Sequence, residues 1–226
     1  MIKAILFDKD GTLLEFSNIY TDSLVEFLKS KNISETEKEK LFREVGIDEN
    51  GRAVENSILS SETIEDIAQV LAPYFGEEKE DLFKEIDDNI FEYYKENKER
   101  IKMTCDVSHL FKTLKEKDLI IGIFTSDNYR QTKFAMDYLD LSKYIDFVAT
   151  ADIYKKKPDK EGLEVFKEKF NIKDDEIIVI GDSRVDMLFG DDSLTLGVTC
   201  GTGSEKMLSQ YADHIIENPT EVLKFI

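Results

Sequence analysis

Two aspartates separated by a single residue, Asp8 and Asp10, directly follow an apolar run at residues 2–7. Carboxylates with this spacing leave a strand on the same side, where one can attack an electrophile while the other transfers a proton. Gly11 comes next and permits a sharp turn of the backbone. Aspartate and glycine are also common in ordinary turns. The spacing nevertheless favours covalent catalysis, with Asp8 as nucleophile and Asp10 as acid and base.

A second acidic pair, Asp182 and Asp186, follows the apolar run at residues 177–180. Carboxylates that converge at strand ends repel one another unless a cation neutralises them, and hard oxygen ligands suit Mg²⁺. For Asp186 there is an alternative, because acidic residues near a helix N-terminus are also favoured by the helix dipole. We therefore expect a Mg²⁺ site near the ends of the strands.

Two further segments offer contacts for a phosphate group. Thr125 and Ser126 follow the apolar run at residues 119–124, where hydroxyls and backbone N–H groups can hold phosphate oxygens. Serine and threonine are equally common as helix caps. The run Lys155–Lys157, before Pro158, is the densest positive segment of the chain. A lysine beside the carboxylates would keep the nucleophile ionised and neutralise phosphate charge, whereas the alternative is a solvated surface.

Six short apolar runs, with helical patterns between the later ones, must position these residues. Continuous apolar runs of this length suit strands buried on both faces, as in a parallel sheet. The predicted strands are residues 2–7, 119–124, 145–149, 177–180, 195–199 and 214–216, and the predicted helices are residues 107–117, 130–139, 160–170 and 183–189. The alternation predicts an α/β fold with a doubly wound, Rossmann-like parallel sheet, which binds ligands at the carboxyl ends of its strands.

One long segment does not alternate. From residue 15 to residue 103 the apolar positions recur three and four apart, which predicts helices alone. We expect residues 1–14 and 104–226 to form the Rossmann-like core, and residues 15–103 to form a helical cap inserted after the first strand. A predicted loop at residues 46–56 contains Arg52. Arg52 either contacts a carboxylate or second phosphate of the substrate or lies on the surface, and the sequence leaves both open.

The composition limits the choice of partner. Acidic residues outnumber basic ones 48 to 30, for a net charge of −18, which argues against nucleic acid or an anionic membrane as a partner. No apolar run approaches the roughly 18 residues of a membrane span, and no signal-peptide pattern is evident. Cys105 and Cys200 match no zinc or redox spacing. We therefore expect a cytoplasmic protein with reduced thiols.

Taken together, the four segments resemble the motifs of the haloacid dehalogenase (HAD) superfamily of phosphohydrolases. The run Asp8-Lys9-Asp10-Gly11-Thr12-Leu13 is similar to the D-x-D-G-T-L signature, Thr125 to the second motif, Lys157-Pro158 to the third, and Gly181-Asp182 with Asp186 to the fourth. Residues 7–16, 46–48 and 51–52, with Thr125-Ser126-Asp127, are similar to a phosphoglycolate-phosphatase-like branch. Two departures are the missing second proline of the third motif and Ser126 in place of the usual asparagine.

The resemblance implies a mechanism and a set of site residues. Asp8 would attack phosphorus to give an aspartyl-phosphate that water hydrolyses, and Asp10 would protonate the leaving oxygen and then deprotonate the water. Of the three lysines, only Lys157 has the proline of the third motif. The implied residues are Asp8, Asp10, Thr125 and Lys157 for catalysis; Gly11, Thr12, Ser126 and Arg52 for substrate binding; and Asp8, the Asp10 carbonyl, Asp182 and Asp186 for Mg²⁺, with Asp186 acting through water or by orienting Lys157.

We therefore expect a Mg²⁺-dependent phosphatase of a small phosphorylated metabolite, either phosphoglycolate-like or a sugar phosphate. The carboxylate of Asp10 favours phosphate-ester chemistry over dehalogenation. A sugar-phosphate mutase keeps both carboxylates, so this alternative stays open. A phosphorylatable receiver domain also uses clustered acids and Mg²⁺, but it needs no lid and leaves the 89-residue insertion without a role. A non-catalytic relative would lack a key residue, and none is missing.

Overall fold

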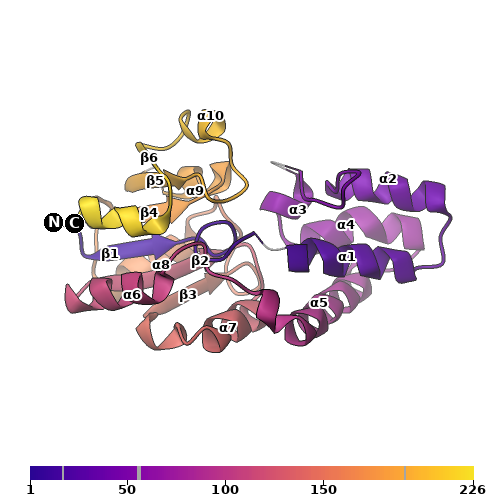
Figure 1. The fold of residues 1–226 in the computed structure, drawn as a ribbon, viewed down its shortest axis with the longest axis horizontal. Coiled ribbons are helices and arrows are strands. Elements are labelled where there is room, and N and C mark those ends of the chain that lie inside the picture. The colour runs from indigo at the N-terminus through magenta and orange to yellow at the C-terminus, as the bar shows by residue number, and fades with distance from the viewer. Residues whose placement is uncertain (17, 55–56, 191) are drawn as a thin grey trace. The chain divides into compact units, whose positions relative to one another are not determined.

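The chain divides into two compact units in the computed structural model, which describes residues 1–16, 18–54, 57–190 and 192–226 (Figure 1). The core unit comprises Met1–Phe16 and Lys102–Ile226, and the helical unit comprises Ser17–Ile101. Among the helices described, none combines the length and the apolar character that crossing a lipid bilayer requires.

The core unit is built on one sheet of six parallel strands in the order β3-β2-β1-β4-β5-β6. The strands are β1 (Ala4–Phe7), β2 (Ile120–Thr125), β3 (Phe147–Thr150), β4 (Ile177–Gly181), β5 (Leu194–Val198) and β6 (His214–Ile216). The chain runs outward from β1 to one edge and then returns to build the other half. This order confirms the expected doubly wound α/β fold, whose switch point lies between β1 and β4.

Both faces of the sheet are buried, because side chains of successive strand residues point to opposite faces. Leu6 of β1 belongs to an apolar cluster with Phe166 and Phe189. Its neighbour Phe7 packs instead on Phe111, with ring centroids 5.3 Å apart. Helices therefore cover the sheet on both sides, as the continuous apolar runs of the strands require.

The helices of the core unit follow the strands in alternation (Figure 1). They are α6 (Val107–Glu116), α7 (Tyr129–Tyr138), α8 (Glu161–Phe170), α9 (Arg184–Phe189) and α10 (Glu205–Leu208). Phe111 lies on α6, whereas Phe166 and Phe189 lie on α8 and α9. The helix α6 thus covers one face of the sheet, and α8 and α9 cover the other.

The helical unit contains α1 (Asn18–Ser30), α2 (Glu35–Val45), α3 (Ile58–Ser61), α4 (Ile64–Phe75) and α5 (Lys79–Glu96). Its own apolar stripes form its core: Ile86, Ile90 and Tyr94 of α5 are buried, and α5 packs against both α1 and α4. At the start of α2, Ser34 and Glu37 form a reciprocal capping box. This unit therefore has helices with defined ends and a hydrophobic interior of its own.

Candidate active site

Three strand ends meet at one edge of the sheet. Phe7, the last residue of β1, pairs in register with Ile123 of β2 and Ile180 of β4. The next residue, Asp8, donates its backbone N–H to the Ile180 carbonyl at 2.8 Å. The segments that follow the three strands therefore begin at nearly the same level. This is the place where a doubly wound sheet binds its ligand.

Asp8 and Asp186 are joined through one buried lysine. Lys157 Nζ lies 2.6 Å from Asp8 Oδ1 and 2.5 Å from Asp186 Oδ1, and it donates to the Phe124 carbonyl at 2.9 Å. Ser183 donates to the other oxygen of Asp186 from both its backbone N–H and its hydroxyl. Both oxygens of Asp186 are thus engaged by protein groups, an arrangement suited to orienting Lys157.

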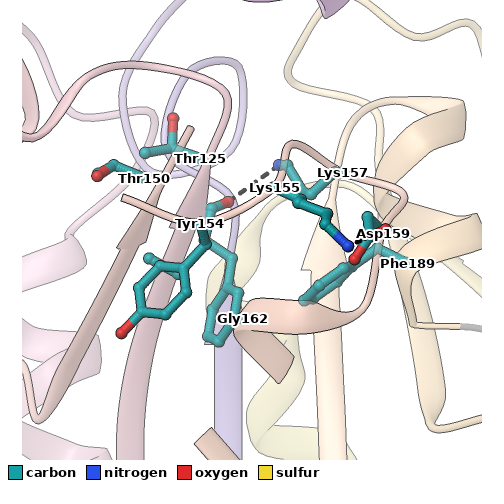
Figure 2. Close-up of a pocket in the computed structure, with 10 residues that line it drawn as sticks. Thr125, Thr150, Tyr154, Lys155, Lys157, Asp159, Gly162 and Phe189 are labelled. Carbon is teal, nitrogen blue, oxygen red and sulfur yellow. Dashed lines mark hydrogen bonds and ion pairs between the residues drawn. The ribbon is translucent and has the colours of Figure 1, made fainter. Parts of the chain in front are cut away.

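The structure distinguishes Lys157 from its two neighbours. The side chain of Lys157 is 7% exposed, whereas that of Lys155 is 67% exposed and lies 3.8 Å from Asp159. Lys156 is also exposed. Figure 2 shows Lys155 directed toward Asp159 and Lys157 directed into the fold beside Thr125. Of the three lysines, Lys157 is the one whose ammonium is described in contact with Asp8.

Asp182 sits in a cradle of small residues. Its Oδ2 accepts hydrogen bonds from the backbone N–H of Thr202 at 2.6 Å and from the Thr202 hydroxyl at 2.9 Å. A Cβ on Gly11 would lie 2.3 Å from Asp182 Oδ2, and one on Gly201 would lie 2.1 Å from it. Because these contacts are shorter than any side chain tolerates, the two glycines make room for the carboxylate. The sequence patterns did not predict a role for Thr202, although the run Gly201-Thr202-Gly203 after a buried strand could have indicated one.

Burial sets the electrostatics of the site. It raises the pKa of Asp8 well above the usual range, with Lys157 opposing the rise and Asp186 adding to it. Burial also raises the pKa of Asp182 to about 7, again with a contribution from Asp186. For Lys157, burial lowers the pKa, but Asp186 and Asp8 together outweigh it and raise the pKa above its ordinary value. One fixed positive charge thus faces three buried carboxyl groups.

These residues fit a hard divalent cation. Carboxylate oxygens of Asp8, Asp182 and Asp186 all lie within 4.8 Å of one another, and all three residues are buried. Among the described residues, no hydrogen-bond donor engages Oδ2 of Asp8 or Oδ1 of Asp182. All-oxygen ligands with carboxylate charge suit Mg²⁺. A cation here would offset the repulsion and desolvation that raise the pKa of Asp8 and Asp182.

Asp10 lies beside a buried positive charge, Lys9, for which the sequence patterns predicted no role. Its carboxylate is 28% exposed, and Lys9 Nζ lies 2.5 Å from Asp10 Oδ2. Lys9 is completely buried and also pairs with Asp127 at 3.0 Å. A lysine directly after a buried apolar strand could have predicted this pair, because a lysine is rarely fully buried unless its charge is paired.

Two expected phosphate-binding residues, Thr125 and Ser126, lie at the carboxyl end of β2. The Thr125 side chain is buried, and its Oγ1 accepts a hydrogen bond from the backbone N–H of Asp127 at 3.1 Å. Ser126 is half-buried. Thr125 lines a small pocket together with Thr150 and Lys157 (Figure 2). Thr125 and Ser126 therefore lie at the same edge of the sheet as the carboxylates of Asp8 and Asp182.

Gly11 and Thr12 lie in the turn after β1, and their expected roles in substrate binding stay predictions. Gly11 has a φ of +82° and donates its N–H to the Leu14 carbonyl, so this N–H is engaged within the turn. The side chain of Thr12 has no exposed surface, and its carbonyl accepts from the Thr104 hydroxyl at 2.5 Å. Both residues thus support the turn, and Gly11 also makes room for the Asp182 carboxylate.

Arg52 belongs to the helical unit. It is exposed, and its backbone N–H donates to Asp48 Oδ1 at 2.8 Å within the loop that follows α2. Residues 55 and 56 of the expected loop lie outside the described residues. The loop geometry presents Arg52 on the surface of its unit.

The fold and the strand-end carboxylates define a hydrolase of the haloacid dehalogenase-like class, and the comparison with known families agrees. Residues 2–192 match the family described as haloacid dehalogenase-like hydrolase. The chain therefore belongs to this family and is an enzyme.

Relatives and solved structures match over nearly their full length. The chain is 26% identical to the pyrophosphatase PpaX of Listeria welshimeri, over 100% of this chain and 96% of that protein. It is 23% identical to the phosphoglycolate phosphatase of Aquifex aeolicus, over 100% and 97%. The crystal structure of a hydrolase from Pseudomonas syringae is similar in fold, with a TM-score of 0.74, 20% identity and coverage of 100% and 97%.

Proposed function

We propose that this hydrolase is a Mg²⁺-dependent phosphatase of a small phosphorylated metabolite, acting through an aspartyl-phosphate on Asp8. The observation that carries the proposal is the buried contact of Lys157 with Asp8, 2.6 Å long, beside Asp182. A buried nucleophilic carboxylate needs a permanent positive partner to stay ionised, and a transferred phosphoryl group needs positive charge around its oxygens.

In the first step, a carboxylate oxygen of Asp8 attacks phosphorus while the bond from phosphorus to the ester oxygen breaks. Asp10 gives its proton to the departing oxygen, so that an alcohol leaves and Asp8 carries the phosphoryl group. The partial exposure of Asp10, 28%, suits a residue that meets a leaving group and exchanges protons with solvent.

In the second step, water attacks the phosphorus of the aspartyl-phosphate and the bond to the Asp8 oxygen breaks. Asp10, now ionised, takes a proton from that water, and inorganic phosphate and the Asp8 carboxylate are released. Lys157 contacts the phosphoryl oxygens and the Asp8 carboxylate through both steps, while Asp186 keeps its ammonium in place. Thr125 and Ser126 hold further phosphoryl oxygens at the end of β2.

Asp8, Asp182 and the backbone carbonyl of Asp10 would hold Mg²⁺, which supplies positive charge for the carboxylates and the phosphoryl oxygens. Asp186 would support the site through Lys157 or through a bound water. This assignment agrees with the raised pKa of Asp8, because a buried carboxyl group that must be ionised needs compensating charge.

The helical unit, residues 15–103 in the proposed division, is the natural source of substrate selectivity, since the core residues engage only the phosphoryl group. Arg52 stays a candidate for a second anionic group of the substrate. The names of the relatives suggest inorganic pyrophosphate and 2-phosphoglycolate as the first compounds to assay.

A panel of phosphate esters, with inorganic pyrophosphate included, tests the proposal by measuring phosphate release with and without Mg²⁺. We expect Mg²⁺-dependent release from at least one compound, and its loss in Asp8→Asn. Undiminished turnover in this variant would contradict the assignment of the nucleophile. Isomerised sugar phosphate in place of free phosphate would establish a mutase.

A further inference from the structure

A fully buried ion pair lies behind Asp10, and the proposed mechanism does not use it. Lys9 has no exposed surface, and its Nζ lies between Asp10 Oδ2 at 2.5 Å and Asp127 Oδ2 at 3.0 Å. Taking a lysine and an aspartate out of water costs several kcal/mol for each ion before their attraction is counted. An apolar side chain at position 9 would avoid that cost, so stability alone gives no reason for this pair.

Asp127 is held rigidly at the end of β2. Its backbone N–H donates to Thr125 Oγ1 at 3.1 Å, and its carbonyl accepts from the backbone N–H of Ala151 at 3.2 Å. Its Oδ1 accepts from the backbone N–H of Asn128 at 2.8 Å, which leaves Oδ2 for Lys9. Asp127 is 8% exposed. It is therefore a fixed anchor for the Lys9 ammonium.

Asp10 is less buried than Asp127, because its carboxylate is 28% exposed and lies on the loop after β1. A carboxylate with that exposure samples several side-chain rotamers unless a partner restrains it. The ammonium of Lys9 is the partner described for its Oδ2, and no described residue bonds its Oδ1. The anchored ammonium thus restrains one oxygen and leaves the other for proton exchange.

We propose that Lys9 and Asp127 are positioning residues for Asp10: Asp127 anchors the Lys9 ammonium, and Lys9 holds Oδ2 of Asp10 so that Oδ1 meets the leaving-group oxygen. The inference rests on the proposed function. Lys9, the residue between the two motif aspartates, would thus act in the proton-transfer step through Asp10, without contacting the substrate.

The test compares two esters that differ in their need for a proton. In 4-nitrophenyl phosphate the leaving group departs as a stable anion, whereas the alkoxide of 2-phosphoglycolate requires protonation. The quantity measured is kcat/KM, because it reports the reaction only through the first irreversible step, in which the leaving group departs. Loss of the later hydrolysis step therefore does not obscure the comparison.

For Lys9→Met we expect kcat/KM to fall about 10-fold or more with 2-phosphoglycolate, but less than about 3-fold with 4-nitrophenyl phosphate. A positioned acid contributes about 10²–10⁴-fold, and the variant retains Asp10 without its restraint. Lys115→Met is the matched control, since it removes the half-buried pair between Lys115 and Asp146, 2.7 Å apart and remote from the strand-end site. That control should affect the two esters equally.

The anchor is tested by Asp127→Asn, alone and combined with Lys9→Met. The combined variant replaces both charges by neutral groups of similar size, which guards against misfolding caused by one unpaired buried charge. With 2-phosphoglycolate, we expect the combined variant to have a kcat/KM no lower than that of Lys9→Met. The two substitutions remove the same restraint on Asp10, so their effects should not add. Losses that multiply would overturn the role of Asp127 as anchor of Lys9.

Equal losses with both esters in a folded Lys9→Met or combined variant would overturn the positioning role while the phosphatase function stands. If the wild-type protein releases phosphate from neither ester nor from any other compound of the panel, the proposed function fails, and this inference fails with it. Circular dichroism and thermal unfolding identify the variants that have folded.

Discussion

The ammonium of Lys157 lies 2.6 Å from a carboxylate oxygen of Asp8, although the two residues are 149 positions apart in the chain. Both side chains are at least nine-tenths buried. The contact exists because the β1 end and the loop after β3 are brought to the same edge of the sheet. It pairs the proposed nucleophile with a positive charge that opposes the rise in the pKa of Asp8 caused by burial.

Replacing Lys157 by Met should lower kcat by about 10²-fold or more, because one preorganised positive donor to a transition state is commonly worth that much. Phosphate release at saturating Mg²⁺ measures the effect. Lys155→Met serves as the control, since Lys155 is exposed and pairs with Asp159. Equal activity in the two variants would contradict the assignment of Lys157.

Replacing Asp182 by Asn should raise the Mg²⁺ concentration needed for half-maximal activity by about 10-fold or more, because one ligand charge is lost. The Thr202 N–H can still donate to the remaining oxygen of the amide, so the fold is retained. A titration of phosphate release against Mg²⁺ measures the effect. An unchanged Mg²⁺ requirement would remove Asp182 from the metal site.

Adding a methyl group at Gly201 should weaken Mg²⁺ binding by steric means alone. In Gly201→Ala the new Cβ would lie 2.1 Å from Asp182 Oδ2, so the carboxylate has to move. Gly51→Ala is a useful contrast, because its Cβ would meet nothing within 4 Å although its φ is +73°. The Mg²⁺ titration should shift for the first variant and not for the second, and a reversed pattern would contradict the cradle.

Without a divalent cation, the protein should become less stable as pH rises from 5 to 8. Burial raises the pKa of folded Asp182 to about 7 from a usual value of 3.8. Between these values the folded chain holds a proton that the unfolded chain has lost, so the free energy of unfolding falls with rising pH. The raised pKa of Asp8 acts in the same direction.

Thermal unfolding in a chelating buffer should show this as a decrease of a few degrees in Tm across that range. Added Mg²⁺ should raise Tm more at pH 8 than at pH 5, because it binds the ionised carboxylates. Asp182→Asn should reduce the pH dependence of the metal-free protein. A Tm that rises with pH in the chelating buffer would contradict the raised pKa.

Periodicity was enough to predict the fold class. Apolar runs such as residues 177–180 have no polar alternation, which is what a strand covered on both faces requires, and the parallel sheet confirms this reading. Because such sheets bind ligands at the carboxyl ends of their strands, the residues that follow the strands were the candidate site residues. In the structure, carboxylate oxygens of Asp8, Asp182 and Asp186 lie within 4.8 Å of one another. Their catalytic and metal-binding roles remain predictions.

The roles of other residues depend on burial, which local patterns do not encode. The three consecutive lysines are alike in sequence, but only Lys157 is directed into the site. Gly11 and Thr12 belong to a motif, yet the turn engages the N–H of one and buries the side chain of the other. Lys9 reads as a variable position within the motif and proves to be a fully buried ion.

The sequence by itself determined the alternation of strands and helices, the helical insertion, and the acids that follow the strands, because each depends on spacing along the chain. Only the tertiary structure decided that Lys157 contacts Asp8, that Thr202 and two glycines hold Asp182, and that Lys9 lies between Asp10 and Asp127. These contacts join segments far apart in the chain, and Lys157 and Asp8 alone are separated by 149 positions. They are set by the order of the strands in the sheet, which places distant loops at one edge and removes their charged groups from water.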